Sequence, residues 1–117
     1  HVHGTATVAA VRRSEHNLEL VFQVGPEVLP YLFEKGFVGV DGCSLTVGVV
    51  SPTARTFAVH LIPETLRVTT LGELAEGDAV NIEVDANTQA AVDTVHRVLG
   101  GLGLDAAALR ALVEARP

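Results

Sequence analysis

The sequence predicts a small all-β fold, and three observations support this prediction. Short apolar runs alternate with polar residues at a period of two, as half-buried strands do. Turn-forming Gly, Pro, Asn and Asp residues separate these runs. Six strands, mostly antiparallel, can be counted before residue 86, with one short helix expected after the second strand and another after the fifth. Such a succession of short strands favours a small closed barrel or a sandwich.

The first strand is expected over residues 5–12, which are apolar and β-branched. Residues 18–24 alternate as a half-buried second strand does, with Leu, Phe and Val on the side facing the core. A short helix is then expected over residues 28–34. Gly36 would stop this helix, and Pro30 would keep it short or irregular.

The central hairpin covers residues 37–50, with a tight turn at Asp41-Gly42. This dipeptide is a strong hairpin signal, because a primed turn needs positive φ angles, which Gly adopts freely and Asp tolerates. The residues after the turn fall on two faces: Cys43, Leu45, Val47 and Val49 on the core face, and Ser44, Thr46 and Gly48 on the other. The two hydroxyls suit either an ordinary half-exposed strand or a polar strip that binds a small ligand. The pattern alone leaves both readings open.

The last strands follow the hairpin. Residues 56–62 alternate as a fifth strand, and residues 79–84 as a sixth. Between them, residues 64–71 are expected to form one or two helical turns that Gly72 closes.

A helix should begin near Thr88 and be capped by Asp85 or Asn87. It carries an apolar stripe at three- and four-residue spacing, consisting of Val92, Val95, Leu99 and Leu102. Glycines are expected to break this helix from Gly100 onward, and a second, Ala-rich helix is expected over residues 105–115.

Composition limits the possible partners. The chain is 48% hydrophobic, although only 4% of its 117 residues are aromatic, and its mean hydropathy is +0.36. No run approaches the roughly 18 apolar residues of a membrane span, so we expect no membrane segment and some apolar surface for a partner chain. The formal net charge is −6 and the Lys and Arg residues are scattered, so nucleic acid is not an expected partner.

Two residue counts bear on compartment and processing. The single Cys excludes an internal disulfide and fits a reducing cytoplasm. No targeting pattern opens the sequence, and it contains no Met, so we expect His1 to begin a processed product or a piece of a longer protein.

The sequence holds no strict catalytic motif. His1 and His3 share a strand face, but no Cys partner or third ligand follows at useful spacing, so no metal site is expected. Cys43 alternates with core residues, which favours a buried free thiol over a nucleophile. Asp85 has two open roles, as a helix cap or as a ligand contact.

Six segments together resemble the riboflavin synthase family, specifically its C-terminal barrel. They are KGF (35–37), DGCSLTV (41–47), HLIPETL (60–66), TTLG (69–72), NIEVD (81–85) and TQAAVDTVHRVL (88–99). They follow the order of that family, and the resemblance covers nearly all of residues 2–99. The tail beyond Gly100 matches nothing specific.

The resemblance implies a six-stranded antiparallel Greek-key barrel over residues 1–86 and a helical segment over residues 87–117. In that family, two such barrels stand in tandem and a C-terminal helix joins three subunits. Two molecules of 6,7-dimethyl-8-ribityllumazine react without an added cofactor: a four-carbon unit passes from one to the other, giving riboflavin and a pyrimidinedione. The site lies between the N-terminal barrel of one subunit and the C-terminal barrel of its neighbour.

The resemblance also implies roles for individual residues. Ser44 and Thr46 match the polar strand beside the bound ring, and Asp85 matches a carboxylate near the ribityl chain or the reaction centre. His1 matches a histidine at the junction of the two barrels, so Ser44, Asp85 and His1 are the catalytic candidates. The remaining pocket wall matches Val2, Lys35, Gly36, Ile62 and Thr65.

One departure from the family is important. The N-terminal barrel, which carries the family's reactive cysteine, is absent from this sequence, and Ser44 stands where that cysteine would be. Cys43 lies one position earlier and is not given a catalytic role. Two other readings remain: a module that binds lumazine or flavin without turnover, and a barrel kept only for assembly.

Overall fold

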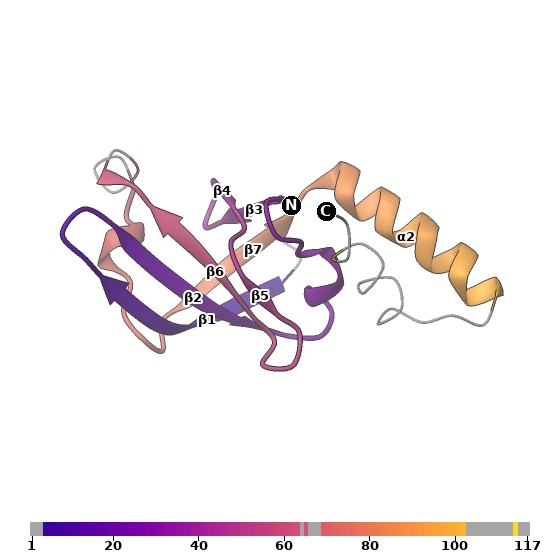
Figure 1. Ribbon diagram of the computed structural model, residues 1–117, viewed down its shortest axis with the longest axis horizontal. Helices are drawn as coiled ribbons and strands as arrows, with labels where there is room; N and C mark the ends of the chain where they lie inside the picture. Colours follow the sequence, from indigo (N-terminus) through magenta and orange to yellow (C-terminus); the bar gives the residue numbers. More distant parts are fainter. Residues whose placement is uncertain (1–3, 64, 66–68, 103–113, 115–117) are drawn as a thin grey trace.

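A computed structural model describes residues 4–63, 65, 69–102 and 114. Its strands form one antiparallel sheet in the order β4-β3-β7-β1-β2-β6-β5, which curls into a half-barrel (Figure 1). The strands are β1 (Gly4–Arg13), β2 (Leu18–Val24), β3 (Phe37–Val40), β4 (Cys43–Thr46), β5 (Val50–Ser51), β6 (Thr56–Leu61) and β7 (Ala79–Val84). The predicted all-β antiparallel fold is confirmed, and the Greek-key description stays a prediction.

The core lies inside the curve of the sheet. The inward faces predicted for the second, fifth and sixth strands are confirmed, because Leu20, Phe22, Phe57, Val59 and Ile82 are fully buried. Phe22 and Phe57 are direct partners in the β2–β6 ladder, and their ring centroids are 5.3 Å apart. Cross-strand aromatic pairs of this kind stabilise a sheet beyond the area that they bury.

The described residues form seven strands where six were predicted, because a β-bulge interrupts the strand after the hairpin turn. Ala58 accepts a hydrogen bond from the Gly48 N–H at 2.7 Å and donates one to the Val49 carbonyl at 2.9 Å. Gly48 and Val49 therefore both lie opposite the single residue Ala58. This extra residue shifts the alternation of inward and outward side chains by one position. Val49 was expected in the core and is instead 65% exposed, while Val50 is buried. The predicted core positions Leu45 and Val47 are confirmed.

The helix predicted over residues 28–34 is wrong. Only Leu29–Tyr31 is helical, as the 3₁₀ turn η1, and Leu32 is already extended. Pro30 stands near the start of this turn and has no N–H to donate, so a regular α-helix cannot run through it. The side chains of Val28 and Leu32 are nevertheless fully buried under the barrel.

The helical turns predicted over residues 64–71 lie partly outside the described residues. Pro63 and Thr65 are helical. A separate 3₁₀ turn, η2, covers Leu71–Glu73, so Gly72 lies inside a turn that it was expected to end.

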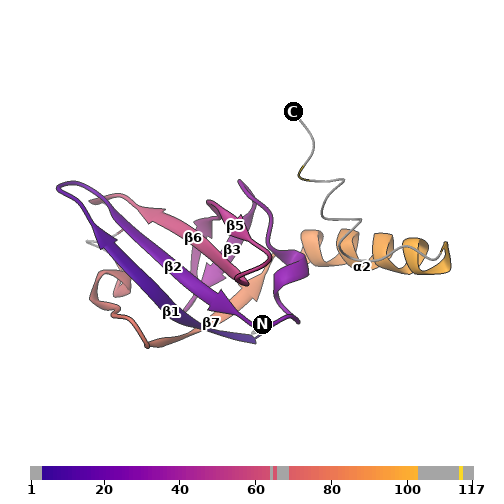
Figure 2. The same ribbon diagram turned by 60° about the horizontal axis from the view of Figure 1, so that its bottom comes forward.

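The terminal helix is α2 (Ala86–Gly101). Of the two predicted caps, Asp85 and Asn87, the N-cap is Asp85. The break predicted at Gly100 does not occur, because Gly100 and Gly101 both lie within the helix. Figures 1 and 2 both show α2 leaving the barrel to one side. Within the stripe expected on this helix, only Val92 is buried. The helix expected over residues 105–115 lies outside the described residues, apart from residue 114.

No helix in the part of the chain that the structure describes has the length and apolar character needed to cross a membrane.

Candidate functional site

The β3–β4 hairpin carries the Ser44 and Thr46 hydroxyls on its exposed face. Its two-residue turn has φ angles of 46° at Asp41 and 83° at Gly42, which confirms a primed turn. The turn is tied to strand β7: Asp41 N–H donates to the Asn81 carbonyl at 2.9 Å, and Asn81 N–H donates to Asp41 Oδ1 at 2.7 Å. The position of the hairpin relative to β7 is therefore fixed at this end.

A row of paired residues crosses the outer face of three strands. Gly39 pairs with Ser44 on one side and with Glu83 on the other. Because Gly39 has no side chain, the row is open at its centre. A Cβ atom at this position would lie 3.2 Å from the Glu83 Cβ.

The opening forms a hollow of about 220 Å³ in the outer wall of the barrel. Its lining residues are Phe37, Val38, Gly39, Gly42, Ser44, Glu83, Val84 and Asp85. Two of the predicted catalytic residues, Ser44 and Asp85, thus meet at one place although 41 positions separate them in the numbering.

Asp85 follows directly on β7 and begins α2. Its Oδ2 atom accepts hydrogen bonds from the Thr88 backbone N–H at 2.9 Å and from Thr88 Oγ1 at 3.2 Å. The sequence left a choice between a helix cap and a ligand contact. The structure shows the cap, and it also places this carboxylate beside the hollow.

Thr46 lies next to the hollow but does not line it. It is exposed, as Ser44 is, and it pairs with Phe37. Lys35 and Gly36 extend the same ladder, since Lys35 N–H donates to the Val47 carbonyl at 2.8 Å and Val47 N–H donates to the Gly36 carbonyl at 2.8 Å. These predicted binding residues are therefore neighbours of Thr46 at the end of the hairpin away from its turn.

Ile62 and Thr65 come after β6, and neither lines the hollow. Ile62 is 57% exposed, which is unusual for so apolar a side chain. The Thr65 carbonyl accepts a hydrogen bond from Thr69 Oγ1 at 2.8 Å. His1 and Val2, the remaining predicted site residues, lie outside the described residues.

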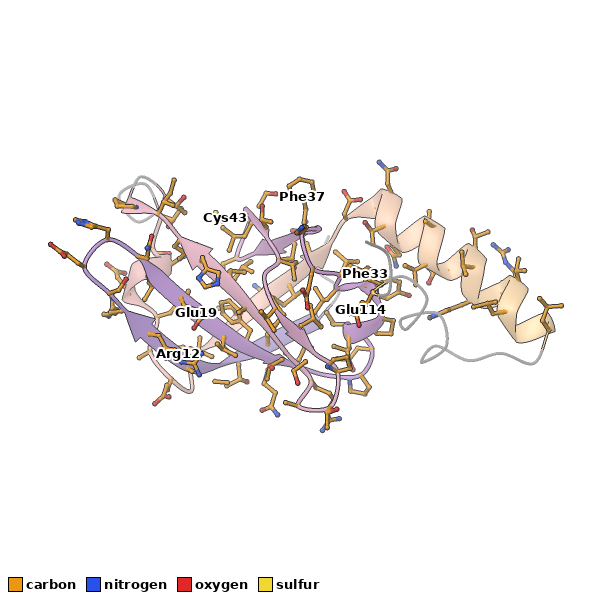
Figure 3. All side chains as sticks on the ribbon, in the orientation of Figure 1. Arg12, Glu19, Phe33, Phe37, Cys43 and Glu114 are labelled. Atoms are coloured by element: carbon orange, nitrogen blue, oxygen red, sulfur yellow. The ribbon has the colours of Figure 1, made fainter. Side chains whose placement is uncertain are left out.

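The sequence prediction missed six of the eight lining residues, namely Phe37, Val38, Gly39, Gly42, Glu83 and Val84. Phe37 is 62% exposed and points away from the barrel, whereas Cys43 is half-buried and packs against the core (Figure 3). A period-two reading of β3 would have placed Phe37 and Gly39 on the outer face. Which residue of β7 faces them depends on strand register, which the sequence does not show.

The chemistry available at the hollow is hydrogen bonding and orientation. Ser44 offers a hydroxyl that both donates and accepts, and Asp85 offers carboxylate oxygens. Phe37 provides an exposed aromatic face, and Gly39 allows a flat molecule to approach the backbone. Such a set of groups suits a planar ligand that carries both polar edges and hydroxyls.

Comparisons with known proteins identify the family of this chain. The family model described as "Lumazine binding domain" matches residues 1–85. The riboflavin synthase of Escherichia coli is 54% identical over 100 residues, which are 85% of this chain and 46% of that enzyme. The riboflavin synthase of Chlamydia pneumoniae is 48% identical over 105 residues, 90% of this chain and 50% of that enzyme. The chain therefore spans about half the length of these curated relatives.

Solved structures support the fold. LumP complexed with riboflavin superimposes with a TM-score of 0.68 at 23% identity, over 74% of this chain and 45% of that one. LumP complexed with 6,7-dimethyl-8-(1'-D-ribityl) lumazine gives a TM-score of 0.66 at 24% identity, over 73% and 46% of the two chains. With residues 1–85 matched by the family model and the half-barrel shared with these structures, the chain belongs to the lumazine-binding domain family.

Proposed function

We propose that this chain is the C-terminal barrel of a riboflavin synthase and holds one of the two lumazine molecules that react. In this reaction, one 6,7-dimethyl-8-ribityllumazine gives a four-carbon unit to a second, which yields riboflavin and a pyrimidinedione. The observation that carries the proposal is the 54% identity to a riboflavin synthase over 85% of the chain. The position of Ser44 and Asp85 at one hollow also supports it.

The groups around the hollow match what a ribityllumazine presents. Ser44, with Thr46 beside it, would bond the polar edge of the ring, and Gly39 would let the ring approach the sheet. Asp85 would accept a hydrogen bond from a ribityl hydroxyl, since ionised carboxylates are strong acceptors. Lys35, Gly36, Ile62, Thr65 and Val2 are proposed as the rest of the wall, with His1 at its edge.

The size of the hollow favours a shared site. Ligand pockets usually enclose about 300–1,000 Å³, and the hollow offers only about 220 Å³ on an open wall. A second surface would have to cover the ligand. The N-terminal barrel of a neighbouring subunit, carrying the second lumazine, would provide that surface.

The catalytic contribution of this barrel would be orientation. Two rings held face to face react as if at a very high effective concentration, and well-aligned intramolecular reactions gain about 7–11 kcal/mol in this way. No strong base on the protein is needed if the acidic methyl group of one lumazine supplies the reactive carbanion. Ser44, Asp85 and His1 would hold the rings and the ribityl chains in that alignment.

The proposal includes the assembly and its location. Residues 1–86 would form the Greek-key binding barrel, and residues 87–117 would join three subunits in a cytoplasmic homotrimer. The exposed side chains of Val95, Val98 and Leu102 on α2 support a subunit contact, because such apolar surface is usually covered.

The alternative is a module that binds lumazine or flavin without turnover. The shared fold of LumP, whose structures hold riboflavin, flavin mononucleotide and a ribityl lumazine, favours it. The much higher identity to riboflavin synthases favours the enzyme.

The test is to incubate the 117-residue chain with 6,7-dimethyl-8-ribityllumazine and follow riboflavin formation by absorbance. The chain alone should bind lumazine but turn it over weakly or not at all, and a separately made N-terminal barrel of a riboflavin synthase should raise the rate. A Ser44→Val variant serves as the control for site-dependent turnover. Lumazine binding without any gain from the added barrel would favour the non-catalytic module.

A further inference from the structure

Asp85 lines the hollow and is also the N-cap of α2. It follows β7, which is paired on both sides, by β3 and by β1. Its own carbonyl accepts the Gln89 N–H at 2.8 Å in the first turn of the helix. The backbone of Asp85 is therefore fixed from the sheet side and from the helix side, and only its side chain remains to be oriented.

Thr88 orients that side chain with two donors. Both its backbone N–H, at 2.9 Å, and its Oγ1, at 3.2 Å, bond to Oδ2 of Asp85. An ordinary N-cap needs only the backbone bond. Oδ1 has no hydrogen-bond partner among the residues that the structure describes.

We infer that Thr88 is a positioning residue of the lumazine site: its hydroxyl holds Oδ2 of Asp85 so that Oδ1 accepts a hydrogen bond from the ligand. This inference rests on the proposed function. A carboxylate that is already held in one rotamer loses less conformational freedom when a ligand binds, so binding is stronger. The hydroxyl thus contributes to affinity without touching the ligand.

Three variants test the role of the hydroxyl. Thr88→Val keeps the shape and the backbone N–H but removes the hydroxyl, and it should weaken lumazine binding about threefold to tenfold, the scale of one hydrogen bond. Thr88→Ser should restore near wild-type affinity. Thr94→Val, which makes the same change at an exposed position of α2, is the matched control and should bind as the wild type does. Affinity is measured by lumazine fluorescence titration and helix content by circular dichroism.

A double-mutant cycle separates positioning from general support of the helix. Asp85→Ser keeps an N-cap oxygen and removes the carboxylate. If Thr88 acts through that carboxylate, Thr88→Val should no longer change affinity in the Asp85→Ser background. Equal weakening in both backgrounds, no rescue by Thr88→Ser, or unchanged affinity of Thr88→Val would each overturn the inference.

The same titrations distinguish this inference from the function on which it rests. If Ser44→Val weakens binding and Thr88→Val does not, the inference fails while the proposed site stands. If the wild-type chain shows no affinity for lumazine, both are overturned.

Discussion

Tyr31 Oη donates a hydrogen bond to Asp93 Oδ1 at 2.5 Å, and this contact joins two parts of the chain that lie 62 residues apart. Tyr31 belongs to η1 and Asp93 to α2. Val92, beside Asp93, is the buried residue of α2. The bond and this one apolar side chain therefore fix how the helix leaves the barrel, and the helix begins at the edge of the hollow.

Removing this bond should loosen the helix. Tyr31→Phe keeps the ring and is expected to lower the free energy of unfolding by about 0.5–1 kcal/mol, since a bond to a charged acceptor is weakened here by its exposure to solvent. Urea unfolding measures the loss, and hydrogen exchange of the α2 amides shows where it occurs. Tyr31→Phe combined with Asp93→Ala should cost little more than either change alone, because both remove one contact. Additive losses would show that the two residues act separately.

High pH should break the same contact. The hydrogen bond to Asp93, followed by burial and by the negative charge of Asp93, raises the pKa of Tyr31 above 10.0. The folded state therefore holds this proton more tightly than the unfolded chain does. The stabilisation is complete below pH 10.0 and is lost as the pH rises above 10.0 through the folded-state pKa.

This pH dependence can be measured without ambiguity, because Tyr31 is the only tyrosine of the chain. Its ionisation is followed by ultraviolet absorbance, and Asp93→Asn is the control that should move the midpoint down toward 10.0. A wild-type midpoint at or below that value would contradict the contact.

The two hydroxyls of β4 should matter for binding more than for folding. Changing both Ser44 and Thr46 to Val should leave the unfolding transition nearly unchanged, because both side chains are exposed and Val suits a strand. Lumazine binding should weaken by about 1–3 kcal/mol, the cost of leaving polar groups of the ligand unmatched. Unchanged affinity in a folded double variant would remove these hydroxyls from the site.

Gly39 should act through the space that it leaves. Gly39→Ala would place a Cβ in the hollow and 3.2 Å from the Glu83 Cβ, so lumazine affinity is expected to fall. Gly100→Ala is the matched control: among the described residues, no atom apart from its chain neighbours and its own helix backbone lies within 4 Å of the added Cβ, and the change should stabilise α2 by about 0.5–1 kcal/mol without affecting binding. If Gly39→Ala binds lumazine normally, the ligand does not lie over this glycine.

Local patterns predicted most of the strands, because side-chain alternation and turn residues are properties of neighbouring positions. They failed at Gly48, where a bulge arises from pairing with Ala58 on a different strand. The hollow was predicted only in part for the same reason. Ser44 could be found from its own strand, but the row through Gly39 to Glu83 depends on the register of β3 and β7. Asp85 could not be assigned one role because it has two neighbours, the helix and the hollow.

The exposed apolar face of α2 gives the last prediction. Val95, Val98 and Leu102 lie on a side of the helix that the barrel does not cover, and Leu102 is 70% exposed. If this face joins subunits, the 117-residue chain should self-associate at micromolar concentration, and Val98→Lys with Leu102→Lys should give monomers, because a desolvated ammonium group opposes apolar burial. Ala90→Lys, at an exposed position about 80° around the helix from Val98, is the control and should leave the mass unchanged. Sedimentation equilibrium measures the mass of each form. A monomeric wild-type chain would mean that α2 alone does not assemble the protein, and association that survives both lysines would place the contact on another surface.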